Sequence, residues 1–381
     1  MTLPRPDIDP DGLLEYSVVF TDLSLNHMSQ RFVGVMQQLI DDLTSTYQAQ
    51  AVAVVPGGGT YGMEAVARQL ATGRRCLVVR NGFFSYRWSQ ILDQGRIADE
   101  VEVLTARPTA DTHPGHWAPP PAQEVVDAIA ARHPQMVFAA HVETSAGILL
   151  PDEYIRAVAR STHEAGGLFV LDCIASGALW VDMADLGVDV LLTAPQKGWS
   201  GSPGAGYVLL NDAARAAVQH STSTSFAADL KRWLDIAQGY AQGQHGYHVT
   251  MPTDTLAHNV EVMQEAARVG LPALRDAQVE LGQRVRDLLA DRGFVSVAAP
   301  DYAAPSVVVV HTEDPDLKSG KKLIRAGLQV AAGVPLMCGE PEDWSTFRLG
   351  LFGLDKLTDI EGTLTRLAEG LDHALADGKG S

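Results

Sequence analysis

A single lysine, Lys197, lies in the segment TAPQKGWSGSPG, residues 193–204, directly after an apolar stretch that is typical of a buried strand. The small residues around it allow a bulky ligand to approach the backbone. A lysine at the carboxyl end of a buried strand has a lowered pKa and can form a Schiff base with a carbonyl compound. Spacing alone fits a surface lysine in a Gly–Ser loop at least as well, so the accompanying residues decide its role.

An acidic residue, Asp172, ends the apolar run of the segment GGLFVLDCIASG. A carboxylate in such a place must be paired or hydrogen-bonded. It can hold the protonated nitrogen of a pyridine ring and so sustain an electron-accepting cofactor. Alternatively, it caps a following helix, as aspartate often does at strand–helix turns.

A glycine-rich turn follows the first expected strand in AVAVVPGGGTYGMEA, residues 51–65. The turn opens a helix, and backbone N–H groups together with the helix dipole bind phosphate at such a place. Thr60 adds a hydroxyl donor. The turn therefore predicts a phosphate site.

The same turn also fits the pattern GxGxxG through Gly57, Gly59 and Gly62, which leaves a nicotinamide-dependent oxidoreductase open. An acidic residue normally ends the second strand of that fold, whereas this chain has Arg80, which suits a 2′-phosphate. This alternative gives Lys197 no role.

Further candidate residues follow other expected strands. The aromatic segment NGFFSYRW, residues 81–88, can supply a ring that stacks on a planar cofactor. Thr144, in HVETSAG, is a hydroxyl donor at a strand end. Arg348 lies beside an apolar strand, where we expect its guanidinium to meet a carboxylate.

The elements that position these residues alternate between short β-branched runs and amphipathic helical stretches. This alternation predicts an α/β fold with a mostly parallel seven-stranded sheet in a large domain, and ligands bind beyond the carboxyl ends of such strands. The expected helices include Met63–Leu70, Pro121–Arg132 and Pro151–Ala165. The expected strands are Ala51–Val55, Leu77–Arg80, Val101–Leu104, Met136–Ala140, Leu168–Asp172, Val190–Thr193 and Gly206–Leu210.

The last third of the chain reads as a smaller α+β domain of ordinary size. We expect a large, ligand-binding domain over residues 1–265, with an N-terminal arm, and the small domain over 266–381. The Pro-rich segment Thr112–Pro121 is expected to be a surface loop. The expected elements of the small domain are Thr255–Leu289 (broken around Gly270–Pro272), Val307–Val310, Ser319–Ala326, Phe347–Leu351 and Leu357–Leu375.

Composition limits the classes of partner. The 381 residues carry a formal charge of −17, which disfavours nucleic acid and anionic membranes. No apolar run approaches the ~18 residues that a membrane span needs. Three scattered cysteines without a CxxC pair fit the reducing cytoplasm, and the twelve histidines show no HxH or HExxH spacing that predicts a metal site.

Taken in order, these motifs resemble the class V aminotransferases of the fold-type-I pyridoxal-phosphate enzymes, in particular the alanine–glyoxylate and serine–glyoxylate branch. The segments PQKG, LDCIASG and RLGLFG carry the resemblance, which covers nearly the whole chain. It implies pyridoxal 5′-phosphate as cofactor and a homodimer with shared active sites. Met28 stands where many members of that branch have arginine.

The resemblance also assigns roles around the cofactor ring. Lys197 would be the residue that attaches the cofactor, and Asp172 the partner of the pyridine nitrogen. Phe84, at the tryptophan of the family's NGxWGxR motif, would stack on one face of the ring and Ile174 on the other. Thr144 would donate to the ring hydroxyl or the phosphate.

The phosphate and substrate residues follow from the same comparison of motifs. Tyr247 and Thr250 match the family's YHxT segment, which reaches the phosphate of the neighbouring subunit. Arg348 would bind the substrate α-carboxylate. The implied phosphate residues within one subunit are Gly58, Gly59, Thr60 and Gln196.

The implied activity is transfer of an amino group from a small amino acid to a small 2-oxo acid, such as glyoxylate or pyruvate, in two half-reactions. A cysteine desulfurase or lyase of the same fold is the nearest alternative, because Cys338 precedes Arg348 in the segment VPLMCGEPEDW. The acidic residues in that segment oppose formation of a thiolate, and Gln196 stands where desulfurases usually have a histidine.

Overall fold

The computed structural model describes residue 8, residues 11–112 and residues 114–376. Its centre is a seven-stranded sheet in the order β1-β11-β10-β9-β6-β2-β3. All seven expected strands are present, with ends within two residues of the expectation, and the α/β fold class is confirmed. The strands are β1 (Ala51–Pro56), β2 (Arg75–Arg80), β3 (Glu100–Thr105), β6 (Met136–Ala140), β9 (Leu168–Asp172), β10 (Val190–Thr193) and β11 (Ala205–Leu210).

Strand direction explains why the candidate residues gather. The pairs β10–β9, β9–β6, β6–β2 and β2–β3 are parallel. Strand β11 runs antiparallel to both β1 and β10, so β1 points the same way as β10. All strands except β11 therefore end at one edge, and the residues that follow them meet there.

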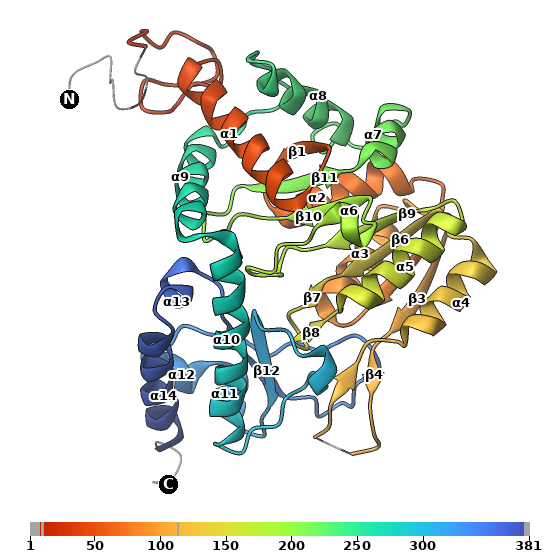
Figure 1. Ribbon diagram of the computed structural model, residues 1–381, viewed down its shortest axis with the longest axis vertical. Helices are drawn as coiled ribbons and strands as arrows, with labels where there is room; N and C mark the ends of the chain where they lie inside the picture. Colours follow the sequence, from red (N-terminus) through yellow and green to blue (C-terminus); the bar gives the residue numbers. More distant parts are fainter. Residues whose placement is uncertain (1–7, 9–10, 113, 377–381) are drawn as a thin grey trace.

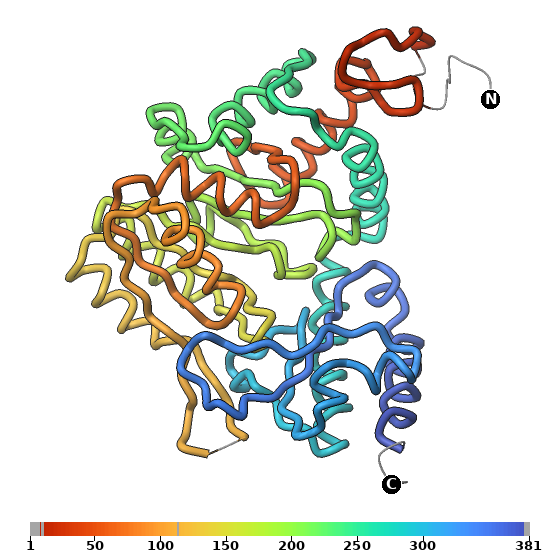
Figure 2. Tube along the Cα trace, turned by 180° about the vertical axis from the view of Figure 1, so that it is seen from behind, coloured from red at the N-terminus to blue at the C-terminus, as the bar shows by residue number. Residues whose placement is uncertain are grey.

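Helices cover both faces of this sheet. Helices α2 and α3 pack on the face shown in Figure 2, whereas α4 and α5 cover the opposite face shown in Figure 1. Residues 67–71, which we expected to continue the helix after the glycine-rich turn, form a π-helix. The helices of this part are α1 (Gln30–Tyr47), α2 (Gly59–Val66), α3 (Phe83–Gln94), α4 (Ala122–Arg132), α5 (Asp152–Glu164), α6 (Met183–Leu186), α7 (Asp212–Gln219), α8 (Leu230–Ala241) and α9 (Thr253–Val269).

The C-terminal part has its own three-stranded sheet, in the order β12-β14-β13, and its own hydrophobic core. Gly270, at φ 101°, provides the expected break between α9 and α10. The expected boundary at residue 265 falls inside α9 and stays a prediction. The elements are α10 (Leu271–Ala290), the 3₁₀ turn Pro300–Tyr302, β12 (Val307–His311), α11 (Pro315–Lys318), α12 (Lys321–Arg325), β13 (Ala331–Ala332), β14 (Thr346–Gly350), α13 (Leu354–Leu357) and α14 (Ile360–Ala376).

One expectation about a loop was wrong. Within Thr112–Pro121, Trp117 is buried and belongs to β5 (Trp117–Ala118), which pairs with β4 (Arg107–Pro108). Its ring packs against Trp344 at a centroid distance of 5.5 Å, inside a core that both parts of the chain share. This contact could not be predicted from the proline-rich segment, because the partner tryptophan is far away in the sequence. A further hairpin joins β7 (Val142–Glu143) to β8 (Ile148–Leu149).

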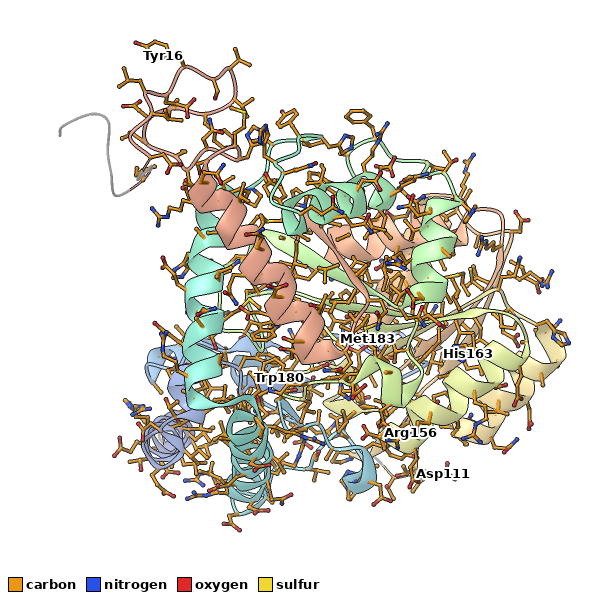
Figure 3. The ribbon with its side chains drawn as sticks, turned by 45° about the horizontal axis from the view of Figure 1, so that its top comes forward. Tyr16, Asp111, Arg156, His163, Trp180 and Met183 are labelled. Atoms are coloured by element: carbon orange, nitrogen blue, oxygen red, sulfur yellow. The ribbon has the colours of Figure 1, made fainter. Side chains whose placement is uncertain are left out.

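The described residues before α1 form a looped segment without helix or strand at one end of the molecule (Figure 3). Several of its apolar side chains are uncovered, with Tyr16 88% and Val18 103% exposed, whereas Leu25 is buried. Among the residues described, no helix combines the length and apolarity needed to cross a membrane.

A buried carboxylate, Asp189, connects several elements around the sheet. Its oxygens accept the Phe169 backbone N–H at 2.7 Å and the Asn211 amide at 2.7 Å. His163 Nε2 lies 2.9 Å from one of them. With 2% of the residue exposed, solvent cannot replace these bonds.

We therefore expect Asp189→Ala to lower the free energy of unfolding by about 2–4 kcal/mol, because it leaves buried donors without an acceptor. The exposed Asp212, which forms a surface ion pair with Arg215, provides the control. Its replacement by alanine should cost less than about 1 kcal/mol. Urea denaturation of both variants measures the difference, and equal effects would contradict the role of Asp189.

Candidate functional site

A cavity of about 210 Å³ lies at the edge where the parallel strands end. It brings together most of the residues that the motifs singled out, from five separate segments of the chain. Of the predicted residues, Gly59, Thr60, Phe84, Thr144, Asp172, Ile174, Gln196 and Lys197 line it. The remaining lining residues are Met63, Arg87, Ala140, Val142 and Ala175.

Lys197 reaches the cavity from the loop after β10. Its Nζ lies 5.2 Å from the centre of the Phe352 ring, and among the described residues it forms no hydrogen bond or ion pair. Burial, followed by the positive charges of Arg348 and Arg87, lowers the pKa of Lys197. The amine is thus biased toward its neutral, nucleophilic form.

Asp172 ends β9, in register between Ala140 and Leu192 of the neighbouring strands. It is 8% exposed, and its Oδ1 accepts the Ile174 backbone N–H at 3.0 Å. Burial raises the pKa of its carboxyl to about 6. No helix starts here, because the next one is α6, so the alternative of a helix cap was wrong.

The glycine-rich turn closes another side of the cavity. Gly58 precedes the first turn of α2, and a Cβ on Gly59 would lie 2.5 Å from Ile174 Cδ1. A side chain at position 59 would therefore displace the end of the Ile174 side chain at the helix N-terminus. Gly62 packs on the sheet, where a Cβ would lie 3.4 Å from Val208 Cγ2. It does not line the cavity.

The ring of Phe84 is positioned by a buried carboxylate that the motif analysis missed, Glu143. Its two oxygens accept the backbone N–H groups of Phe84 and Ser85 at 3.2 and 2.8 Å. They also accept the hydroxyls of Ser85 and Ser145, each at 2.7 Å. Glu143 thus fastens the N-terminus of α3 to hairpin β7–β8, which carries Thr144. An acidic residue inside the strand-end segment HVETSAG was the signal available in the sequence.

Arg348 extends from β14 toward the same cavity. Its Nε donates to the Ala332 carbonyl at 2.9 Å and its Nη1 to the Thr144 carbonyl at 3.5 Å. The guanidinium carbon lies 5.4 Å from the Phe84 ring centre. In the described part of the chain, Arg348 has no ion pair within 4.0 Å, so the expectation that it meets a carboxylate stays a prediction. Its charge remains available to an anionic ligand.

Two predicted residues lie elsewhere. The hydroxyls of Tyr247 and Thr250 are 3.3 Å apart, and Tyr247 is 55% exposed. Neither lines the cavity of its own chain. Their predicted role in a neighbouring subunit stays a prediction.

Arg87 is the second charged residue that the motif analysis passed over. It lies one helical turn after Phe84 on α3 and lines the cavity. The arginine of the quoted motif NGxWGxR coincides with it, so the signal was present in the sequence.

Cys338 does not have the environment of a nucleophile. Its Sγ lies 3.4 Å from the Arg80 carbonyl oxygen, to which it donates. Burial, with the nearby charges of Glu143 and Glu340, raises the pKa of Cys338 to about 12. The thiol therefore stays protonated at neutral pH, contrary to the needs of a desulfurase.

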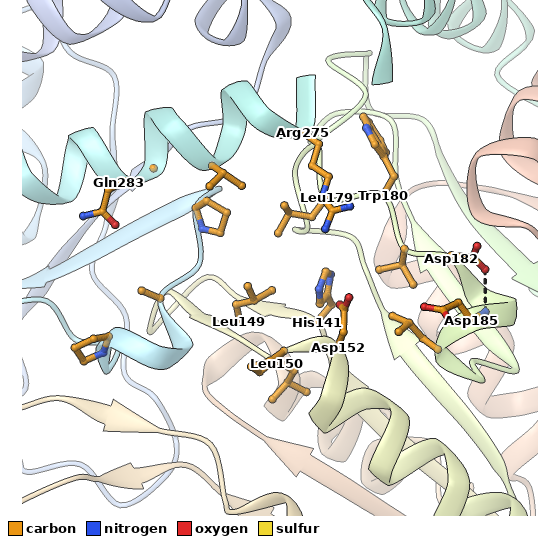
Figure 4. A pocket seen from close by; sticks show the side chains of 18 of the residues that line it. His141, Leu149, Leu150, Asp152, Leu179, Trp180, Asp182, Asp185, Arg275 and Gln283 are labelled. Carbon is orange, nitrogen blue, oxygen red and sulfur yellow. Dashed lines mark hydrogen bonds between the residues drawn. The ribbon is translucent and has the colours of Figure 1, made fainter. Parts of the chain in front are cut away.

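A larger cavity of about 420 Å³ lies between hairpin β7–β8 and α10 (Figure 4). It shares no lining residue with the first cavity, and its lining within the described chain contains no lysine. His141 points into it, with Nδ1 2.7 Å from Ser176 Oγ, and burial lowers the pKa of His141 to about 4. Of these two cavities, only the first therefore has a lysine amine in its described lining.

The known proteins compared with this chain below are aminotransferases or transaminases. The model of the family Aminotransferase class-V matches residues 15–342. The 2-aminoethylphosphonate–pyruvate transaminase of Burkholderia ambifaria (strain MC40-6) is 28% identical over 94% of this chain and 95% of its own. The alanine–glyoxylate aminotransferase of Nostoc sp. superposes with a TM-score of 0.76 at 21% identity, covering 92% of this chain and 88% of that one. A Thermus thermophilus aspartate aminotransferase gives 0.75 at 23% identity, with 92% and 93% covered.

The raised pKa of Asp172 has a consequence for stability. Because the pKa is about 6 in the folded chain against an ordinary value of 3.8, ionisation of this carboxyl costs stability as the pH rises through that interval. Asp172→Asn, which keeps the acceptor for Ile174, should raise the free energy of unfolding of the cofactor-free protein at pH 8 by roughly 1–3 kcal/mol. Below pH 4 the gain should vanish.

Chemical denaturation of both proteins at pH 4 and pH 8 measures this difference. Asp182→Asn, an exposed acid near α6, is the matched control and should change little at either pH. A variant that is less stable than the parent at pH 8 would contradict the unfavourable burial of the Asp172 charge.

Proposed function

The chain belongs to the class-V aminotransferase family, and from this membership we propose that it uses pyridoxal 5′-phosphate to move an amino group from a small donor to a small 2-oxo acid. One observation carries the proposal: the Lys197 amine and the Asp172 carboxylate face one cavity, and neither forms an ion pair with the other or with another described residue. The named relatives transfer amino groups to pyruvate or glyoxylate, which supports one of these as the acceptor.

The cavity suits the cofactor in the chemistry of its lining. Gln196 Oε1 is buried without a hydrogen-bond partner among the described residues. Asp172 has one oxygen, Oδ2, that takes no bond from the described chain. The absence of a side chain on Gly59 keeps the space beside Ile174 open. An aromatic ring, a carboxylate, an amine and a helix N-terminus are the groups that a phosphorylated pyridine requires.

Roles follow from these positions. Lys197 would attach the cofactor, Asp172 would hold its ring nitrogen in the protonated form, and Thr144 would donate to the ring hydroxyl or the phosphate. Phe84 and Ile174 would contact the two faces of the ring. The phosphate would rest on Gly58, Gly59, Thr60 and Gln196.

When bound, pyridoxal 5′-phosphate supplies an electron-accepting ring that stabilises the electron pair left by the α-proton of the donor. Once the amino group of the donor has taken its place on the cofactor, Lys197 Nζ, with its pKa lowered, would accept that proton and deliver it to the carbon to which the lysine had been attached. Asp172 keeps its negative charge opposite the ring nitrogen, because a cation there favours the ionised carboxyl. The buried setting of both groups keeps water from competing for the proton.

Arg348 would bind the acid group of the substrate. Two backbone carbonyls fix its guanidinium, and no described carboxylate neutralises it. A planar guanidinium binds a carboxylate through two parallel bonds. Because the donor of the curated relatives carries a phosphonate, we include 2-aminoethylphosphonate with alanine, serine, aspartate and glycine among the donors to be tested.

The active unit that we propose is a homodimer. Thr60 in the phosphate turn is exposed, and the large side chains of Tyr61, Phe226 and Tyr247 are 59%, 76% and 55% exposed. Exposed aromatic side chains of this size favour an interface. Tyr247 and Thr250 of each chain would then complete the phosphate site of the other.

We further propose that the protein works in the cytoplasm. Cys76, Cys173 and Cys338 are all free thiols, which fits a reducing compartment. Partners other than the substrates and a second copy are not needed for the proposed chemistry, and the charge of −17 disfavours nucleic acid.

The absorption spectrum tests the cofactor and the lysine together. We expect a visible band when pyridoxal 5′-phosphate is added, and covalent labelling of Lys197 after borohydride reduction. Lys197→Ala should lose this labelling and at least about 10²–10⁴-fold in kcat. Replacing the exposed Lys321 by alanine should change neither readout.

Adding each donor separately should shift the band for those that react, and a 2-oxo acid should restore it. A protein that develops no band with the cofactor would overturn the proposed function. Labelling at a lysine other than Lys197 would overturn the assignment of the residue alone.

Sharing of active sites can be tested by mixing two defective chains. Lys197→Ala and the double variant Tyr247→Ala/Thr250→Ala should each be nearly inactive as homodimers. Heterodimers would contain one intact site, so random pairing should restore about a quarter of the parental activity. Activity no greater than the sum of the two separate variants, or a fully active double variant, would refute the shared site.

A further inference from the structure

Arg87 occupies a place in the cavity that the roles above leave unused. Its Nη1 donates a hydrogen bond to Thr60 Oγ1 at 3.0 Å, across from α3 to the glycine-rich turn. Its guanidinium carbon lies 5.4 Å from the centre of the Phe84 ring. Within the described chain no carboxylate comes within 4.0 Å of it.

Two guanidinium groups therefore lie at the same distance from one aromatic ring, since Arg348 also lies 5.4 Å from the Phe84 ring centre. Their anchors differ. Arg87 is tied to Thr60 at the N-terminus of α2, whereas Arg348 is tied to Thr144 and Ala332. In a chain with a formal charge of −17, two cations without acidic partners in one cavity indicate that two anionic groups bind there.

The hydrogen bond to Thr60 also sets the direction of the threonine hydroxyl. Thr60 Oγ1 accepts the hydrogen bond from Arg87 Nη1, so its own O–H is free to donate to a ligand. The backbone N–H groups at the start of α2 point to the same place. A charged donor, a hydroxyl and helix N–H groups thus converge beside the open space that Gly59 leaves.

Resting on the proposed function, we propose that Arg87 binds the phosphate group of pyridoxal 5′-phosphate, directly and by orienting the Thr60 hydroxyl, while Arg348 is reserved for the acid group of the substrate. The Phe84 ring is near both arginine side chains. Charge-assisted bonds to a dianionic phosphate are the strong class of hydrogen bond, which suits a site otherwise made of neutral groups.

The experiment compares two probes, pyridoxal 5′-phosphate and pyridoxal, which differ only in the phosphate. Their dissociation constants are measured by absorbance titration of the full-length cofactor-free protein. Arg87→Gln should weaken binding of the phosphorylated probe by about 10- to 100-fold and change pyridoxal binding by less than about twofold. Arg87→Lys, which keeps the charge but loses the fork, should fall between the parent and Arg87→Gln.

Two variants complete the comparison. Arg348→Gln should leave the ratio of the two dissociation constants unchanged and raise KM for the 2-oxo acid. Arg96→Gln removes the same charge from the exposed segment just after α3 and should alter neither quantity. Thermal unfolding of each cofactor-free variant identifies any loss of folding. If Arg87→Gln fails to fold, Arg87→Lys is compared with the parent in its place.

Several outcomes would overturn the proposal. Equal losses for both probes would make Arg87 a residue that merely supports α3. An unchanged ratio with a raised KM would make it a substrate-binding residue instead. A parent protein that binds neither probe would refute the proposed function itself, which is a different result from an unchanged ratio in a protein that binds both.

Discussion

The charged groups of the cavity are the constraint on which the rest of the structure depends. Lys197, Asp172 and two arginines line or border a space of about 210 Å³, and none of them forms an ion pair with the described residues. Burying a charge without a partner costs several kcal/mol by order of magnitude. Part of that cost is avoided by changes in protonation, because burial raises the pKa of Asp172 and lowers that of Lys197. The charges of such a site are suited to a charged ligand, because they do not neutralise one another.

Such a site persists only if its supports are rigid, and Glu143 is the clearest support. A single carboxylate that accepts five hydrogen bonds joins α3 to hairpin β7–β8, and so fixes Phe84 relative to Thr144. Its charge also acts at a distance. It raises the pKa of Asp172 and favours the cationic form of Arg348. One buried residue thus sets both the geometry and the electrostatics of its neighbours.

The sequence predicted those parts of the site that depend on local pattern. Each expected strand was a short apolar run, and Asp172 and Lys197 were recognisable as polar residues placed directly after such runs. Contacts between segments that are distant in the sequence could not be predicted from local pattern. Nothing near Trp117 predicts that it packs on Trp344, and Arg87 acquires its role from Thr60, which belongs to another helix. The boundary predicted at residue 265 coincides with no local break, because α9 continues to Val269.

The two sheets contribute different chemistry to the cavity, and this division has a consequence for specificity. Asp172 and Lys197 follow strands of the large sheet, whereas Arg348 comes from β14 of the small one. The bonds that join the two beside the site include Arg348 Nη1 to the Thr144 carbonyl at 3.5 Å, the Leu354 backbone N–H to Ser200 Oγ at 2.8 Å and Ser306 Oγ to the Ala175 carbonyl at 3.0 Å. The distance from the Lys197 amine to the Arg348 guanidinium, which we propose binds the acid group, is therefore set by how the sheets pack rather than by either sheet alone. A donor is selected by the span between its amino group and its acid group, so substitutions along this junction can alter substrate choice while leaving the cofactor residues in place.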